Sequence, residues 1–393
     1  MELWQEWLGL LLRWIHVIAA ITWIGDSLLF MWIDRNLRDD PQRKEGVTGV
    51  TWMIHGGGYY TLEKRLLEPG KLPPYLRWFW LEATTTWISG FLLVIVVYYM
   101  SAGAMMVDPA VSKISTVAAV HLGIFLLPVA WLIYDGLWRT PLRHHTLIAV
   151  AISFALFMGV TWGLLHLLSP RAAYLHLGAM LASLMAFNVW VHILPPQRKM
   201  YQAAKEGREV DYGLGKHAKA RSTQNTYMTF PVIFLMLSNH FPSIYGNPYN
   251  WALVGLLFIF GASLRHLMLV GYNEGKWTAA AAVISLAVSV WLTIAPAAPP
   301  TTAVTTKIKF SEVRVIVAKR CNECHSQHPT QPGFAAAGGG VMMDTPEQIK
   351  ALAPRILVRA VEQKTMPLAN MTDMPDKERE ILGEWIRGGA PIQ

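Results

Sequence analysis

The only two cysteines of the chain, Cys321 and Cys324, are followed directly by His325. Cys-x-x-Cys-His is the spacing of c-type haem attachment, in which two thiols bond to the porphyrin edge and the adjacent imidazole binds the iron. The alternatives for a Cys-x-x-Cys pair are a disulfide or part of a zinc site, and zinc needs further thiol or imidazole ligands. Helix-like segments before and after the motif favour haem and predict a small, all-helical, class I cytochrome c domain.

A methionine is expected as the second axial ligand, because Met/His ligation raises the potential of a haem that relays electrons. Met366 lies in a Thr-Met-Pro segment that has the composition of a loop, and its proline favours extended backbone. Met371 and Met374 are the alternatives. The sequence therefore predicts one covalent haem c with His325 and Met366 as its iron ligands.

The rest of the chain has the composition of a membrane protein. The full sequence is 53% apolar and only 15% charged, whereas a soluble domain has about a quarter charged residues. Since about 20 apolar residues cross a bilayer as a helix, we expect an all-α, polytopic bundle of about eight spans. These are 8–33, 78–100, 114–137, 146–168, 172–194, 224–241, 250–270 and 277–297, so that a transmembrane domain (1–297) precedes a linker (298–306) and the cytochrome domain (307–393).

Basic residues predict the orientation of these spans. Eighteen Lys and Arg residues fall in the odd-numbered loops and two, Lys113 and Arg171, in the even-numbered loops. The positive-inside rule then places the odd loops in the cytoplasm and both termini in the periplasm of a bacterial inner membrane. The net charge of +8 therefore reports topology, and no nucleic-acid partner is expected. Haem attachment to such motifs outside the cytoplasmic membrane agrees with this orientation.

Ionisable residues inside the spans are costly and are candidates for function. His16 lies deep in the first span, and Asp26 in the same span needs a partner, for which Arg265 is a candidate. His121, His176 and His240 lie near the periplasmic ends of their spans, where they could bind a second, b-type haem or a substrate. Asp135 and His192 lie toward the cytoplasmic side and are equally well explained as wet, interfacial residues.

Several segments resemble the membrane-bound bacterial urate oxidase (urate hydroxylase) family. They cover nearly the whole chain: His16 to Asp26, His55-Gly-Gly-Gly-Tyr-Tyr60, Trp78 to Glu82 with Thr86 to Gly90, Asn188 to Lys199, Ser222 to Tyr227 with Phe234 to Pro242, and Arg265-His266. The glycine triplet by itself predicts a flexible turn or a close approach of backbone to a ligand. One motif departs from the family, since Gln224-Asn-Thr-Tyr227 stands where we expect His-Asn-Asn-Tyr.

The resemblance implies a catalytic function. Such proteins are thought to oxidise urate to 5-hydroxyisourate and to pass the electrons to their own cytochrome domain without releasing hydrogen peroxide. Arg265 would then pair with the urate anion, and His16 or Asp26 would act as the base. Trp23, Trp87 or Phe230 would stack on the purine. A soluble cytochrome c or a terminal oxidase is the expected acceptor beyond the c-type haem.

Two other classes of function remain open from the residues. In the first, the bundle is a non-catalytic electron-transfer subunit that serves a dehydrogenase or quinone. In the second, it transports copper or another small solute, as many Met and His residues suggest. Few Met-x-x-Met patterns occur together with His, and a fused cytochrome has no evident role in a passive carrier, so transport is the weakest of the three.

Overall fold

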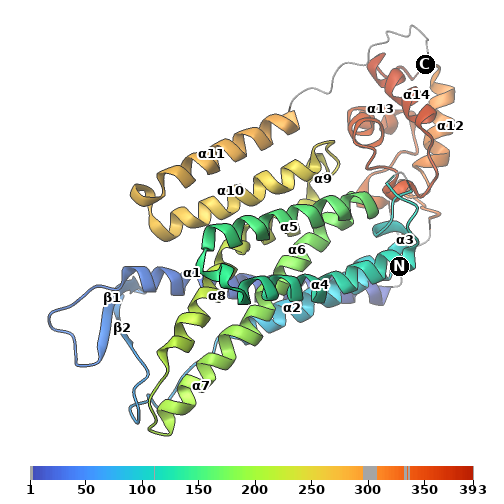
Figure 1. The fold of residues 1–393 in the computed structure, drawn as a ribbon. Helices are drawn as coiled ribbons and strands as arrows, with labels where there is room; N and C mark the ends of the chain where they lie inside the picture. The colour runs from blue at the N-terminus through green and yellow to red at the C-terminus, as the bar shows by residue number, and fades with distance from the viewer. Residues whose placement is uncertain (1–2, 110, 295–307, 332–333, 335–336, 393) are drawn as a thin grey trace.

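The computed structural model describes residues 3–109, 111–294, 308–331, 334 and 337–392. Figure 1 shows long helices in a bundle with a smaller helical body at one end. In the bundle the elements are α1 (Leu3–Asn36), β1 (Val47–His55), β2 (Gly58–Arg65), α2 (Leu81–Leu93) with η1 (Val94–Tyr99), α3 (Ala102–Met105), α4 (Thr116–Arg139), η2 (Pro141–His144), α5 (Thr146–Leu167), α6 (Pro170–Phe187) with η3 (Asn188–Ile193) and α7 (Leu194–Lys205), α8 (Tyr212–Leu237), η4 (Ser238–His240), α9 (Pro242–Tyr245), α10 (Asn250–Val270) and α11 (Tyr272–Ile294).

Seven helical segments in the described part of the chain are long and apolar enough to cross a membrane, which confirms a polytopic helical protein. They correspond to seven of the eight predicted spans. The remaining one, 224–241, lies in α8, which begins earlier, at Tyr212, and is too polar along its first half to be counted as a span. The helix nevertheless packs on α6 and α10 within the bundle.

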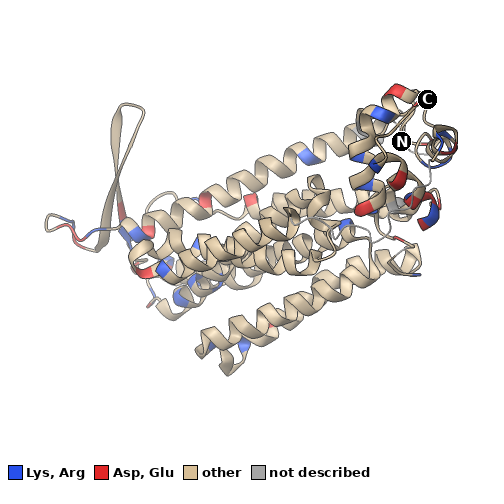
Figure 2. Cartoon of the chain, turned by 90° about the horizontal axis from the view of Figure 1, so that it is seen from above, with Lys and Arg blue, Asp and Glu red and all other residues tan. Residues whose placement is uncertain are grey.

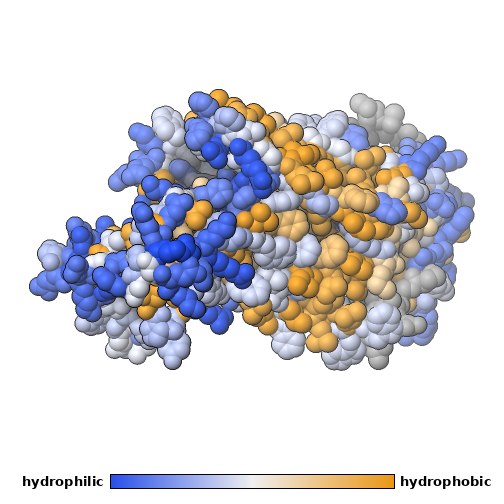
Figure 3. Space-filling model, turned by 60° about the horizontal axis from the view of Figure 1, so that its bottom comes forward, coloured by the Kyte–Doolittle hydropathy of each residue, from blue (hydrophilic) through white to orange (hydrophobic). Residues whose placement is uncertain are grey.

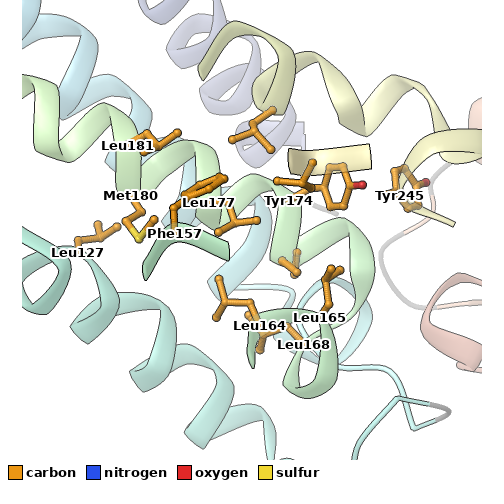
Figure 4. Close-up of a cluster of buried hydrophobic side chains, with 14 of the residues drawn as sticks. Leu127, Phe157, Leu164, Leu165, Leu168, Tyr174, Leu177, Met180, Leu181 and Tyr245 are labelled. Carbon is orange, nitrogen blue, oxygen red and sulfur yellow. The ribbon is translucent and has the colours of Figure 1, made fainter. Parts of the chain in front are cut away.

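The core of the bundle is built around α6. In the segment Pro170–Lys205, two thirds of the membrane-spanning stretch is buried, against a third or less for the other spans. Leucine, methionine and aromatic side chains from α4, α5 and α6 meet in this core, which Figure 4 shows with Met180, Leu177 and Tyr174 at its centre. The outer helices expose apolar side chains instead, in the orange band between the blue ends in Figure 3. Apolar surface outside and backbone bonded within helices is what a bilayer requires.

Charged residues gather at the two ends of the bundle and leave its middle almost free of them (Figure 2). A two-stranded antiparallel sheet projects from the end away from the C-terminal body (Figure 1). Gly56 and Gly57 both have positive φ and form its two-residue turn, as the twist of a hairpin requires. The glycine triplet is thus at a turn, and this short hairpin is an addition to the predicted helical fold.

The C-terminal body contains α12 (Phe310–Arg320), η5 (Gly338–Gly340), α13 (Pro346–Ile356), η6 (Leu357–Glu362), η7 (Leu368–Asn370) and α14 (Asp376–Arg387). It has a hydrophobic cluster separate from that of the bundle, in which Phe310 of α12 packs on Trp385 of α14. Arg320 binds both carboxylate oxygens of Glu378 and so ties the same two helices together. The predicted linker, 298–306, lies outside the described residues.

Candidate functional site

The densest group of buried ionisable side chains lies where α4, η3 and α8 meet. Oδ1 of Asp135 accepts hydrogen bonds from Nε2 of His192 at 2.6 Å and from Nη2 of Arg221 at 2.8 Å. Its Oδ2 is 2.7 Å from Nε of Arg139. Nδ1 of His192 lies 3.2 Å from Nε2 of His217, which is exposed. A chain of hydrogen bonds therefore connects a buried carboxylate to the surface at the α7–α8 end.

Amide and phenol groups continue this network toward the middle of the bundle. The Tyr134 hydroxyl donates to Oε1 of Gln224, and Nδ2 of Asn188 donates to the same hydroxyl at 3.0 Å. Nδ2 of Asn188 also donates to Oδ1 of Asn225 at 2.8 Å. The Arg221 guanidinium lies over the Tyr134 ring at 5.4 Å. We call Asp135, His192, Arg221, Tyr134, Asn188, Gln224 and Asn225 the Asp135 cluster.

A second buried guanidinium, Arg265 of α10, has a different environment. Only 3% of the residue is exposed, and its Nε and Nη2 have no hydrogen-bond partner among the described residues. Nδ1 of the neighbouring His266 is hydrogen-bonded to the Tyr227 hydroxyl at 2.7 Å. A buried cation whose N–H groups are unpaired is complementary to an anion. The predicted Arg265–Asp26 ion pair is absent from the described residues.

The other two predicted catalytic residues lie on the α1 side of the bundle. Nδ1 of His16 is 3.0 Å from the carbonyl oxygen of Thr86 and 3.2 Å from Oγ of Ser89. Its ring packs directly on Gly90, where a Cβ atom would lie 2.8 Å from Cε1. Asp26 is half-buried and near Glu82, whose Oε2 is buried with no partner in the described structure. His16 therefore holds α1 against α2, and Asp26 belongs to a separate carboxylate pair.

The three histidines predicted to bind a second haem or a substrate have dissimilar surroundings. His176 is buried, with Nδ1 2.8 Å from the Ala172 carbonyl oxygen and Nε2 3.2 Å from the Tyr99 hydroxyl. His121 and His240 are exposed, and His121 stacks on Phe125. Because both nitrogens of His176 are engaged in hydrogen bonds, its environment does not fit an iron ligand.

In the C-terminal body the Cys-x-x-Cys-His residues follow the end of α12. Nδ1 of His325 faces the Val341 carbonyl oxygen at 3.3 Å, which leaves Nε2 available as a ligand. Burial raises the pKa of the Cys321 thiol to about 12. Two thiols, one imidazole and a methionine suit haem c. A zinc site fits less well, since the described residues contain no group of three His, Cys, Asp or Glu side chains.

Met366 is half-buried against the hydrophobic cluster of the C-terminal body. Arg379 fixes the loop that carries it: Nη1 donates to the carbonyl oxygens of Met366, at 2.7 Å, and Ala360, and Nη2 donates to Oδ1 of Asn370 at 2.9 Å. Met374 is 2% exposed and lies inside the cluster. The geometry therefore favours Met366 over Met374 as a ligand on the surface of the core.

The loop that carries Met366 also contacts the bundle. A Cβ atom at Gly246, just after α9, would lie 2.6 Å from Cγ2 of Thr365 and 3.3 Å from Cβ of Gln363. Beside this contact lies a cavity of about 160 Å³ between the two bodies, lined by residues of both, including Arg171, Tyr245 and Lys364. The proposed haem-ligand loop is thus docked on the bundle at the end opposite the Asp135 cluster.

Comparison with known proteins decides the family. Residues 2–295 match the sequence model of the family described as urate oxidase N-terminal. The chain belongs to this family. The match covers the whole bundle and ends before the C-terminal body. No curated protein and no solved structure matches the chain.

Sequence reasoning alone did not identify Arg221, Asn188 or Gln224 as site residues, and it treated Asp135 and His192 as equally well explained by the membrane interface. The sequence nevertheless contained a signal for this site. His217 and Arg221 shortly precede the Gln224-Asn-Thr-Tyr227 motif, and His192 lies in the fifth predicted span. Their convergence on one point depends on the rotational phase of three helices, which the sequence does not supply.

Proposed function

We propose that the protein oxidises urate to 5-hydroxyisourate and passes the electrons to a haem c bound by its own C-terminal body. The observation that carries the proposal is the family match over the bundle, which makes a urate-related oxidoreductase the coarse function. Urate and water give 5-hydroxyisourate, two protons and two electrons. No oxygen is consumed in this reaction, so no hydrogen peroxide forms.

The C-terminal residues fit the electron acceptor. Cys321 and Cys324 would hold the porphyrin, and His325 and Met366 would bind its iron. When bound, the haem would accept one electron at a time, so that two sequential transfers complete one oxidation. Docking of the 363–368 loop on Gly246 supports direct contact of the proposed haem-ligand loop with the bundle from which the electrons would come. Electrons would then pass to a soluble cytochrome c or a terminal oxidase.

The substrate is expected to meet one of the two buried guanidiniums, since urate is a flat anion at neutral pH. Arg265 supplies unpaired N–H donors, and the hydrogen-bonded Tyr227–His266 pair beside it supplies a proton acceptor. Arg221 is the alternative. His16 and Asp26, the predicted bases, have less support because the described hydrogen bonds of the two buried guanidiniums include neither of them.

The protein is proposed to span the bacterial inner membrane with both termini in the periplasm. The excess of Lys and Arg in the hairpin loop and the α7–α8 connection supports this orientation. Haem attachment and a periplasmic acceptor need the C-terminal body on that side. The charged ends and the apolar band of the bundle support a spanning arrangement (Figures 2 and 3).

Purified full-length protein, mixed anaerobically with urate, tests the proposal. Urate, but not xanthine or allantoin, is expected to reduce a c-type α-band in the visible spectrum, and 5-hydroxyisourate is expected to form in a ratio of one per two haems reduced. If urate leaves the haem oxidised while dithionite reduces it, the proposal fails in favour of a non-catalytic electron-transfer subunit.

A further inference from the structure

Two polar atoms of the Asp135 cluster are buried and have no partner among the described residues: Nη1 of Arg221 and Oδ1 of Asn188. Arg221 is 2% exposed and Asn188 is fully buried. A buried polar atom without a hydrogen bond costs about 1–3 kcal/mol, so a native protein rarely leaves two of them in one cluster. One is a donor and the other an acceptor.

The direction of the surrounding hydrogen bonds fixes which amide atom of Asn188 is free. The Tyr134 hydroxyl donates its only hydrogen to Gln224 and so accepts from Asn188. Nδ2 of Asn225 donates to the Met185 carbonyl oxygen, so Oδ1 of Asn225 also accepts from Asn188. Both contacts require the NH₂ group of Asn188. The hydrogen-bond partners therefore fix the orientation of the amide and leave its oxygen as a free acceptor.

Arg221 is fixed in the same way. Its Nη2 is held by Asp135 at 2.8 Å, and its guanidinium lies over the Tyr134 ring. Asn188 contacts the hydroxyl of the same ring. The free donor and the free acceptor thus belong to side chains that contact one tyrosine. Since Asp135 compensates the charge of Arg221, the site does not need a full negative charge on its ligand.

An N–H donor and a C=O acceptor on two side chains that contact the same tyrosine are of the types that complement a carbonyl next to an N–H, which is the edge of a cyclic amide or ureide. Urate carries such edges on both of its rings. Arg265, by contrast, offers only donors. Trp131 lies beside the cluster, 5.7 Å from the ring of His192 and 5.5 Å from that of Phe187, and provides an aromatic surface for a flat ring.

We infer that Arg221 and Asn188 form the recognition site for the ureide edge of the substrate, with Nη1 donating to a ring carbonyl and Oδ1 accepting from the adjacent N–H. The inference rests on the proposed function and names the site at which it occurs. Asp135 and Tyr134 are positioning residues that hold the two groups. His192 and His217 connect the site by hydrogen bonds to the surface, where a released proton can reach water.

The experiment uses full-length protein in detergent and two kinds of change. Asn188→Leu removes the acceptor, together with the amide group that donates to Tyr134 and Asn225, at nearly constant volume. Arg221→Lys keeps the charge beside Asp135 but lacks Nη1. Thr229→Val is the matched control. Thr229 is buried on α8, the helix of Arg221, and its hydroxyl donates to the backbone carbonyl oxygen of Asn225 in that helix. Urate and its 1-, 3-, 7- and 9-methyl derivatives are the ligands. Affinity comes from equilibrium dialysis, and KM and kcat come from anaerobic haem reduction.

Methylation of the recognised N–H is expected to weaken binding to the unmodified protein about tenfold or more, the effect of one unpaired buried acceptor. The Asn188→Leu protein is expected to bind urate about tenfold more weakly and to lose discrimination against that one methylurate. Arg221→Lys should raise KM by a similar factor, and Thr229→Val should change neither value. Haem content and melting temperature identify variants that fail to fold.

Equal ratios for all methylurates in the unmodified and Asn188→Leu proteins would overturn the inference while leaving urate oxidation intact. If urate binds and Asn188→Leu weakens it, but urate does not reduce the haem, the recognition site stands and the proposed oxidation fails. If dialysis detects no urate binding to the unmodified protein, both fail.

Discussion

Gln224 shows how one residue can replace another at a fixed contact. It accepts the hydrogen of the Tyr134 hydroxyl, at the position where the resemblance leads us to expect histidine. An imidazole nitrogen is also an acceptor, so the substitution keeps the hydrogen bond that orients Tyr134. The departure from the family motif thus preserves the Asp135 cluster.

Replacement of Gln224 tests this reading of the contact. Gln224→His should change the free energy of unfolding little, whereas Gln224→Leu should lower it by about 1 kcal/mol or more, because the Tyr134 hydroxyl loses its acceptor. Thermal unfolding in detergent measures both. Equal stability of the Leu and His variants would contradict the assignment of this hydrogen bond.

The three methionines near the end of the chain allow a second test at single residues. Met366→Ala should remove the methionine–iron absorption band of the oxidised haem and lower its reduction potential, because the thioether ligand is lost. Met371→Ala should leave both unchanged. Met374→Ala should keep the ligation but destabilise the C-terminal body by about 2–4 kcal/mol, since Met374 lies in its core.

Visible spectra, redox titration and thermal unfolding of the three variants separate these outcomes. Loss of the band in Met371→Ala, with Met366→Ala unaffected, would reject Met366 as the ligand. Arg379 holds the loop through three acceptors. Loss of the band in Arg379→Lys but in none of the methionine variants would mean that the band depends on the loop conformation and not on the Met366 side chain.

Among the secondary-structure elements, α8 marks where sequence analysis succeeds and where it fails. Apolar runs correctly predict seven of the spans, because contact with lipid requires uninterrupted apolar surface. The first half of α8 is polar, since His217, Arg221 and Asn225 face α4 and η3 instead of lipid. A hydropathy rule assumes lipid contact and therefore predicts only its second half.

The candidate site was predictable only in part for a related reason. Arg265 could be identified because a lone charge in an apolar run is conspicuous. The pairing of Asp135 with His192 could not be identified, because the rotation of each helix about its axis decides whether two side chains on different helices meet. The β-hairpin was missed because a two-residue glycine turn gives a local signal, while its strands lack a clear alternation of apolar and polar residues.

Docking of the 363–368 loop on α9 gives a prediction for these elements. Gly246→Val should displace the loop and strain the end of α9, because a Cβ atom would lie 2.6 Å from Cγ2 of Thr365 and 2.8 Å from the carbonyl oxygen of Pro242. The rate of haem reduction by urate should fall at least about tenfold, while dithionite still reduces the haem fully. Stopped-flow spectroscopy measures both rates. Asn247→Ala, next to Gly246 but bonded to the Leu292 carbonyl oxygen, is the control for local disturbance of the turn.

An unchanged urate rate in Gly246→Val would contradict a route through this contact. A parallel loss with dithionite would assign the effect to the haem itself. Limited proteolysis adds an independent readout, since a displaced loop should be cut sooner than in the unmodified protein.

For the whole molecule, the count of crossings decides on which side of the membrane the C-terminal body lies. Figure 1 places the N-terminus and the C-terminal body at the same end of the bundle. An even number of crossings is needed for that, so α8 must cross together with the seven apolar helices. The polar half of α8 can do so because Arg221, its buried cation, is paired with Asp135 inside the bundle.

Single cysteines on opposite ends test the crossing. Lys350→Cys lies exposed on α13 and Tyr59→Cys lies exposed on the hairpin. In intact spheroplasts, a membrane-impermeant maleimide should label Lys350→Cys at once and Tyr59→Cys only after permeabilisation, because the basic hairpin loop stays in the cytoplasm. The unmodified protein measures labelling of Cys321 and Cys324. If both sites, or neither, are labelled in intact spheroplasts, the hairpin and the C-terminal body lie on the same side of the membrane, and α8 does not cross.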